Sequence, residues 1–174
     1  MTLGPGGSGL AEALEAVHDV ARPSPGVLPD YRPYRQQSYD PPRWARDATV
    51  WERAVEMFHG PAPDIPPRFV HRDFHPGNVL WAGGSVGAIV DWPYASIGIP
   101  DVDVGHTRLN LFFYDDDLAR SFTAAWEELA GARFHPWADV VAIVGSLDNL
   151  RAHPPAARAR VAIEEALVRA AESE

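Results

Sequence analysis

The 174-residue sequence contains no cysteine, no lysine and no long apolar run. The lack of cysteine excludes disulfides, thiolate catalysis and cysteine-bound zinc. A membrane-spanning helix needs about eighteen or more consecutive apolar residues, and since no such run occurs we expect no membrane segment. The first residues carry neither a basic group nor an apolar stretch, which argues against a secretory signal and makes the cytoplasm the default location.

The charged residues are unbalanced. All 15 basic residues are arginine, so a reaction that needs a lysine must obtain it from outside this chain. The formal net charge is −9, whereas nucleic-acid binding by counterion release needs clustered basic residues. We therefore expect neither a nucleic acid nor a membrane as a partner. The length predicts a single domain over residues 1–174.

Hydrophobic spacing predicts an α+β, mainly α, chain with one small β-hairpin. Apolar residues recur at helical spacing over about 10–21, where Ser8 is the expected N-cap, and over 45–58, where Gly60 is the expected end. The proline-rich stretch 22–43 between them is typical of a long ordered loop. Beyond Pro100 the helical pattern returns in four segments, at about 101–113, 115–130, 136–150 and 155–172. Asp115 or Asp117 should begin the second of these, and Gly131 should end it.

The middle of the chain has strand character. Arg68–His71 is a short strand candidate. The apolar runs Val79–Trp81 and Val86–Val90 are separated by Ala-Gly-Gly-Ser, which predicts a β-hairpin.

The segment His71-Arg72-Asp73-Phe74-His75-Pro76-Gly77-Asn78 is the richest in chemical groups. It lies between two strand candidates and should form a loop. A hairpin returns its ends to the same place, so Asn78 at its start and Asp91 at its finish should be neighbours, with Asp73 on the loop that leads into them. Phosphoryl transfer needs a carboxylate beside the attacking hydroxyl and hard oxygen ligands for Mg²⁺. The spacing predicts that set of groups.

The whole motif, FVHRDFHPGNVLW followed by the hairpin and AIVDWPYASIGIPDVDV, resembles the signature of the aminoglycoside phosphotransferase family and its choline-kinase-like relatives. Those enzymes usually carry H-G-D-x-H-P-x-N, then I-D-W, then G-D-P-x-x-D. The close match spans about residues 69–106, and a weaker match extends to the helix LAEALEAVHDV and to the helices after 107. The order and spacing of the polar positions make the motif specific.

The resemblance implies the C-terminal (large) lobe of a protein-kinase-like fold, with a core motif region at 69–106 and a helical substrate-side region at 107–174. It implies that Asp73 is the catalytic base or hydroxyl-orienting residue and that His71 braces the catalytic loop. It also implies that Asn78 and Asp91 hold Mg²⁺ against ATP. Asp103 is implied to be a structural acid that supports this loop from the start of a helix.

Two positions depart from the family pattern. Residue 72 is Arg where Gly is usual, which is similar to the H-R-D form of protein kinases. Residue 99 is Ile where Asp is usual, which should loosen a local cap. Neither departure removes a chemical group of the core set.

The N-terminal β lobe of such kinases is expected to be missing. Residues 1–70 predict two helices and a proline-rich loop, and no lysine is present to contact the ATP phosphates. We therefore expect a truncated lobe that binds ATP weakly and, on its own, transfers phosphate to a hydroxyl of a small molecule slowly or not at all. A lobe supplied in trans by another chain would complete it. The apolar surface that such a partner normally covers would be exposed here, so we also expect a tendency to self-associate.

Other interpretations stay open at this stage. The chain could be a non-catalytic remnant or binding module of kinase-like fold. It could also be a metal-dependent hydrolase that uses His71, Asp73 and His75, which would share one face of a strand.

Three groups outside the motif have an uncertain role. The acidic run Asp115–Asp117, with Glu127 and Glu128, fits a solvated helix terminus or a pocket for a cationic substrate. His106 is expected to be a packed or capping histidine. The aromatic and Arg-rich loop could line a substrate cleft or cover the helices; its members are Tyr31, Tyr34, Arg35 and Tyr39.

Overall fold

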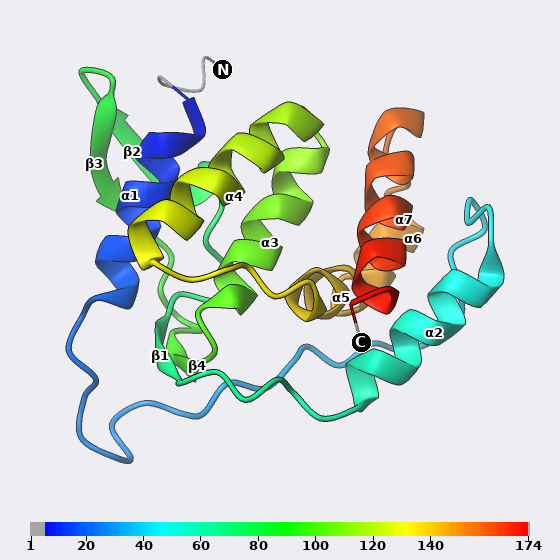
Figure 1. Ribbon diagram of the computed structural model, residues 1–174, viewed down its shortest axis with the longest axis horizontal. Helices are drawn as coiled ribbons and strands as arrows, with labels where there is room; N and C mark the ends of the chain where they lie inside the picture. The colour runs from blue at the N-terminus through cyan, green and yellow to red at the C-terminus, as the bar shows by residue number, and fades with distance from the viewer. Residues whose placement is uncertain (1–5, 174) are drawn as a thin grey trace.

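The computed structural model describes residues 6–173, and helices dominate it (Figure 1). The helices are α1 (Gly6–His18), α2 (Ala48–His59), α3 (Asp101–Phe112), α4 (Asp116–Ala130), α5 (Trp137–Val144), α6 (Leu147–Ala152) and α7 (Ala157–Ala171). The mainly helical prediction is confirmed. None of the helices in residues 6–173 is long and apolar enough to span a bilayer.

In the described part of the chain, four short strands form two separate antiparallel pairs. The predicted hairpin is confirmed: β2 (Val79–Ala82) pairs with β3 (Ser85–Ile89), with an irregularity in register after Leu80. The strand predicted at 68–71 is also present as β1 (Arg68–Val70). It pairs with β4 (Ser96–Gly98), which the sequence pattern did not predict. This second pair brings the start of the catalytic loop against the segment that follows the hairpin.

Helix α3 lies at the centre of the molecule, between α4 and α5 (Figure 1). It is buried along most of its length, because its apolar residues are distributed around the helix rather than along one stripe. Gly105 permits the close approach of α5, since a Cβ at that position would lie 2.3 Å from the Ala138 carbonyl oxygen. The buried pair Arg108–Asp139, with an Nε–Oδ1 distance of 2.8 Å, joins the same two helices.

Several helix boundaries differ from the predictions. Ser8 lies inside α1, so it is not the N-cap. Helix α2 begins three residues later than expected, at Ala48, because Asp47 caps it by accepting a hydrogen bond from the Thr49 amide. Gly60 is confirmed as its C-cap.

The predicted ends of the helices after α3 are confirmed in one case and wrong in the other. Asp115 is confirmed as the N-cap of α4, and Gly131 ends that helix in the left-handed conformation at φ 62°. The single helix predicted at 136–150 is wrong. It is divided into α5 and α6 at Gly145 and Ser146. Glycine and serine have low helix propensity, and the Gly145 carbonyl oxygen is bonded by the side chain of Gln36 instead.

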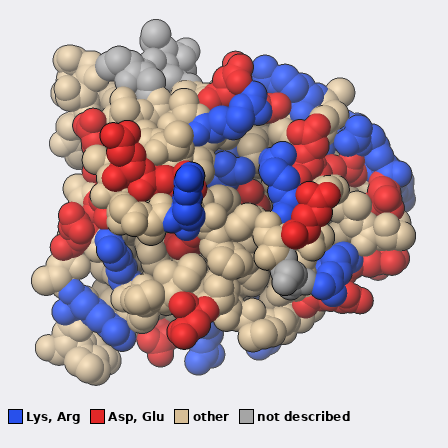
Figure 2. Space-filling model, in the orientation of Figure 1, with Lys and Arg blue, Asp and Glu red and all other residues tan. Residues whose placement is uncertain are grey.

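The long loop predicted at 22–43 is confirmed, and it is tied to the rest of the protein at several points. The Tyr31 amide donates to the Ile97 carbonyl at 2.8 Å, and the Asp148 amide of α6 donates to the Gln36 side-chain oxygen at 2.8 Å. Figure 2 shows arginines interspersed with acidic residues on one face, without a continuous basic surface on the part of that face that is described.

Candidate active site

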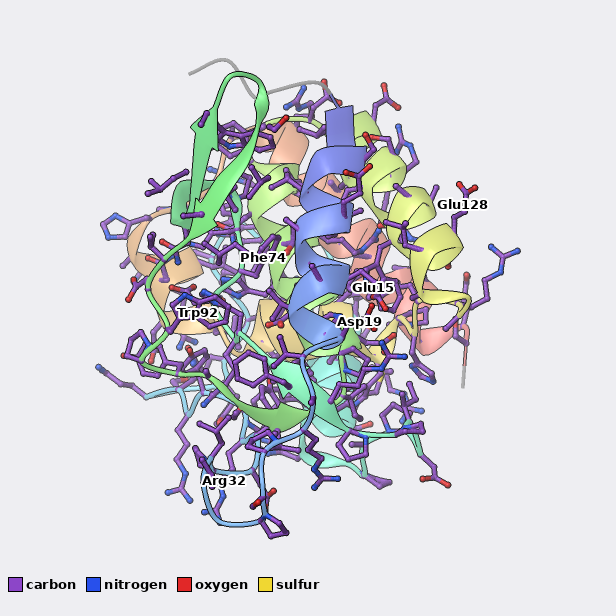
Figure 3. The ribbon with its side chains drawn as sticks, turned by 90° about the vertical axis from the view of Figure 1, so that its left-hand side faces the viewer. Glu15, Asp19, Arg32, Phe74, Trp92 and Glu128 are labelled. Carbon is purple, nitrogen blue, oxygen red and sulfur yellow. The ribbon has the colours of Figure 1, made fainter. Side chains whose placement is uncertain are left out.

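The catalytic loop, residues 71–78, connects β1 to β2 and ends in a short 3₁₀ turn at Pro76–Asn78. In the view of Figure 3, Trp92 lies below the hairpin. Phe74 is fully buried and anchors the middle of the loop in the core. Apolar packing therefore anchors the loop, while the side chains of Asp73 and His75 remain partly exposed.

Asp103, in the first turn of α3, supports the loop from the interior. Its buried carboxylate accepts the His71 amide at 2.8 Å and the Arg72 amide at 2.6 Å. His18 of α1 approaches the same carboxylate at 3.2 Å. The contacts therefore match the supporting role that the family resemblance implied for Asp103.

The His71 side chain is fully buried, and both of its ring nitrogens have partners within the protein. Its Nδ1 accepts the Asp73 amide at 3.2 Å, so that nitrogen carries no proton. The proton is on Nε2, which donates to the Val90 carbonyl at 3.0 Å. His71 thus joins the catalytic loop to the end of the hairpin as a neutral imidazole.

Both oxygens of the Asp73 carboxylate have a partner. Oδ2 accepts the Asn78 amide group at 3.1 Å, and Oδ1 lies 3.0 Å from His106 Nε2. His75 Nε2 is farther from Oδ1, at 3.8 Å. Partial burial by itself raises the pKa of Asp73, but the hydrogen bond and charge of His106 and the charge of His75 outweigh it and lower the pKa below 3.8. The carboxylate is therefore ionised at neutral pH and half-exposed to an incoming group.

His106 is the site residue that sequence reasoning missed. The expected role as a packed or capping histidine is wrong, because the side chain reaches the catalytic loop and contacts Asp73. A signal was present: His106 lies three residues after Asp103 in a helix, and residues at that spacing share a face. The face of α3 that supports the loop therefore carries both residues.

Asn78 begins the hairpin, and its side-chain amide has a defined orientation. Its Nδ2 donates both to the Asp73 carbonyl at 2.9 Å and to the Asp73 carboxylate. Since both partners are acceptors, the nitrogen must face Asp73, and the amide oxygen remains available on the other side. The backbone carbonyl of Asn78 accepts the Val90 amide at 3.0 Å, which places Asp91 one residue beyond that pairing.

Asp91 has an unusual backbone conformation, with φ at 67°. The left-handed region costs a residue other than glycine roughly 1–2 kcal/mol, and such strain is concentrated at functional sites. Within residues 6–173 the Asp91 side chain makes neither a hydrogen bond nor an ion pair. Burial lowers the pKa of His75, while the charges of Asp73 and Asp91 both act in the opposite direction.

The available groups fit Mg²⁺ chemically. The Asn78 amide oxygen and the Asp91 carboxylate are hard oxygen donors, and neither is used by another described side chain. Mg²⁺ is commonly held by one or two protein oxygens together with substrate phosphates and water. Asn78 and Asp91 would hold such an ion, and a phosphate-bearing ligand and water would supply the remaining coordination.

The structure does not support the hydrolase alternative. Both ring nitrogens of His71 are engaged within the protein, and His75 Nδ1 accepts the Gly77 amide at 3.1 Å. Among the residues that the structure describes, no three His, Asp or Glu side chains form a group that could hold a metal ion. His71, Asp73 and His75 therefore do not share a coordination site.

The acidic run at the start of α4 has a local explanation. Asp115 caps the helix through the Asp117 amide at 2.8 Å, and Asp117 pairs with Arg120. Glu127 accepts the Phe134 amide at 2.9 Å and thereby holds the turn after α4. These carboxylates serve the ends of one helix.

Comparison with known proteins agrees with this geometry. A family model described as the phosphotransferase enzyme family matches residues 7–139. No curated protein sequence matches the chain. Among solved structures, the choline kinase LicA from Streptococcus pneumoniae, in complex with AMP, has a TM-score of 0.55 at 16% identity over 94% of this chain and 61% of that chain.

Two further structures have the same fold. A choline/ethanolamine kinase family protein from Mesorhizobium loti has a TM-score of 0.51 at 16% identity, covering 95% of this chain and 61% of that one. The amicoumacin kinase hAmiN, in complex with AMP-PNP, Ca²⁺ and Ami, has a TM-score of 0.50 at 10% identity, covering 96% and 58%. The chain thus has a kinase-like fold and spans about three fifths of the length of these structures.

Proposed function

Because the chain belongs to the phosphotransferase enzyme family, we propose that it carries the catalytic half of a site that transfers the γ-phosphoryl group of ATP to a hydroxyl of a small molecule. The observation that carries the proposal is the contact between the Asp73 carboxylate and the Asn78 amide, at the end of the hairpin where Asp91 lies. These are the groups that phosphoryl transfer needs, brought together from positions 73 to 91.

Each side chain has a defined part in this reaction. Asp73 orients the acceptor hydroxyl and accepts its proton as the new oxygen–phosphorus bond forms and the bond to the departing ADP oxygen breaks. Its lowered pKa keeps it ionised for this task. Asn78 and Asp91 hold Mg²⁺, which neutralises phosphate charge when bound. His71 and Asp103 position the loop without contacting the substrate.

Exposed apolar side chains next to this cluster favour a ligand or partner surface. Leu80 on β2, Val90 and Trp92 are all more than a third exposed, although each lies near the catalytic loop. Exposed apolar groups gathered around a polar centre are typical of a binding surface. We propose that this surface receives the nucleotide or the protein segment that covers it.

We further propose that residues 1–174 form one domain, the large lobe of a kinase of this family. The core motif region is then 69–106, and the helical region 107–174 provides the substrate side. The chain contains no lysine, so the contact that a lysine makes with ATP phosphates in kinases has to come from a lobe supplied in trans by a different chain, and self-association cannot provide it. ATP binding and phosphoryl transfer by this chain alone are accordingly expected to be weak.

The test separates metal binding from turnover. Mn²⁺ serves as a paramagnetic probe in place of Mg²⁺, and its binding in the presence of ATP is followed by water-proton relaxation. The variants Asn78→Ala and Asp91→Asn should weaken that binding, whereas the exposed control Asp64→Asn should not. Equal binding by all four proteins would contradict the proposed ligands.

Turnover is measured as phosphate transfer to a panel of amino alcohols, sugars and aminoglycosides. Asp73→Asn should reduce any transfer by about 10²–10⁴-fold, the usual contribution of a general base. Transfer that is unaffected by Asp73→Asn would refute the proposed base. Nucleotide and metal binding with no transfer to any acceptor would instead support the alternative, a binding module of kinase-like fold.

A further inference from the structure

The arginine that departs from the family pattern is surrounded by tyrosine rings. The Arg72 guanidinium carbon lies 4.7 Å from the ring centroid of Tyr34 and 4.9 Å from that of Tyr31. The Tyr94 centroid is 6.0 Å away. Tyr34 and Tyr94 also contact each other edge to face, with centroids 5.7 Å apart. The three rings therefore surround a single cation, in the arrangement by which proteins bind ammonium ligands.

The rest of Arg72 shows that its guanidinium is committed to this position. Its Nη2 donates to the Arg32 carbonyl at 2.6 Å. Its Nε is buried and has no hydrogen-bond acceptor in the described part of the chain, as expected for a group that faces aromatic rings. The backbone at Arg72 has φ 73°, a conformation that glycine adopts more readily. The chain thus tolerates backbone strain at the position that carries this side chain.

The cluster borders the candidate active site. Arg72 directly precedes Asp73, and its amide is bound by Asp103. Burial raises the pKa of Tyr34; the charge of Arg72 opposes this, and the charge of Asp73 adds to it. Tyr34 therefore lies within the electrostatic field of the catalytic carboxylate.

That loop is fastened on either side of the cluster by other contacts. The Tyr31 amide donates to Ile97 of β4, and the Gln36 side chain donates to the Gly145 carbonyl at 2.7 Å. Between these anchors, Arg72 joins Arg32 and Tyr34 to the catalytic loop. An arginine at position 72 thus links three separate segments: the long loop, the catalytic loop and the turn that carries Tyr94.

We propose that Tyr31, Tyr34 and Tyr94 form a cation-binding cage, which this chain fills with its own Arg72. The guanidinium acts as an internal ligand that holds residues 31–36 against the catalytic loop. The occupied cage excludes a quaternary ammonium group from this place in the wild-type protein. The inference goes beyond the proposed function and does not depend on phosphoryl transfer.

The test uses Arg72→Gly, because glycine accepts the backbone conformation and keeps the amide that Asp103 binds. Amide hydrogen exchange is measured across the chain, and unchanged protection in α3 and α5 verifies the fold. Residues 31–36 should exchange about tenfold faster in the variant, since losing one such contact is expected to be worth about 1.4 kcal/mol. Tetramethylammonium should slow the same amides saturably in Arg72→Gly and leave the wild type unchanged.

A pair of tyrosine variants tests the cage without altering the catalytic loop. Tyr34→Phe keeps the ring and should match the wild type, whereas Tyr34→Leu should match Arg72→Gly in the exchange of residues 31–36. Equal exchange in the wild type and Arg72→Gly would overturn the internal-ligand role. A response of the wild type to tetramethylammonium, no response of Arg72→Gly, or equal behaviour of the two Tyr34 variants would overturn the cage.

Discussion

Replacing Asp103 by alanine is expected to destabilise the whole protein, although the residue lies under the candidate site and does not contact a substrate. The buried carboxylate accepts two consecutive backbone amides of the catalytic loop, at 2.8 Å and 2.6 Å. The imidazole of His18 lies at 3.2 Å on the same oxygen as the His71 amide. Removal of the carboxylate leaves these three groups buried, and water cannot easily replace it.

The magnitude follows from these contacts. A hydrogen bond to a charged group contributes about 1.5–3 kcal/mol, and breaking a buried charged pair by removing one partner costs roughly 3–5 kcal/mol. Because the contributions are not additive, we expect Asp103→Ala to lose about 3–5 kcal/mol of unfolding free energy. The total stability of a domain is only about 5–15 kcal/mol, so the loss is a large part of it.

Urea unfolding, followed by tryptophan fluorescence and circular dichroism, measures this loss. Asp64→Ala is the matched control: Asp64 is exposed, and that change should stay within about 0.5 kcal/mol of the wild type. Asp103→Asn keeps the volume and one acceptor oxygen, and it should still lose a substantial part of the stability. A loss below about 1 kcal/mol in Asp103→Ala would refute the role of this carboxylate as the main support of the loop.

Three further predictions concern stability. Burial by itself lowers the pKa of His18, but hydrogen bonds to two carboxylates raise it above 6.5. The wild type should therefore exceed His18→Gln in unfolding free energy by the largest margin below pH 6.5, and this margin should shrink as the pH rises through the folded-state pKa. A pH-independent difference in urea unfolding would contradict this. Gly105→Ala should lose about 1–3 kcal/mol of unfolding free energy in the same assay, because its Cβ would lie 2.3 Å from the Ala138 carbonyl oxygen. This loss should exceed the gain from the better helix propensity of alanine. A stabilised variant would show that α5 moves to make room for the Cβ. Burial raises the pKa of Glu164, but its hydrogen bonds to Arg46 lower it below 4.5. The contribution of Glu164 to the unfolding free energy should therefore be present above pH 4.5 and be lost as the pH falls through the folded-state pKa. Glu164→Gln should lose about 1–3 kcal/mol of unfolding free energy at neutral pH, and this difference should vanish in acid.

The candidate site shows how far local reasoning reaches. The pairing of β2 with β3 returns the chain so that Val90 bonds to Asn78, as the two apolar runs and their glycine-containing turn predicted. This outcome is accessible from sequence because hairpin register depends on residues that are close along the chain. The catalytic and metal-binding roles of Asp73, Asn78 and Asp91 remain predictions.

The contacts that complete the site come from distant positions. Asp73 meets His106 across 33 positions of sequence, and the cage around Arg72 combines Tyr31, Tyr34 and Tyr94. No periodicity in the sequence marks these encounters, since they depend on how α3 and the long loop pack against the catalytic loop. Single exposed or half-buried polar residues have the same appearance in sequence whether they contact solvent or each other.

The sequence by itself determined the helical class, the hairpin, most helix ends and the order of chemical groups in the catalytic loop, because spacing along the chain and capping residues act over a few positions. Only the tertiary structure decided that β1 pairs with β4, that the helix after Pro136 breaks at Gly145, and which neighbours engage Asp73 and Arg72. Those outcomes depend on burial and on hydrogen-bond partners far along the chain, which exist only once the helices have packed.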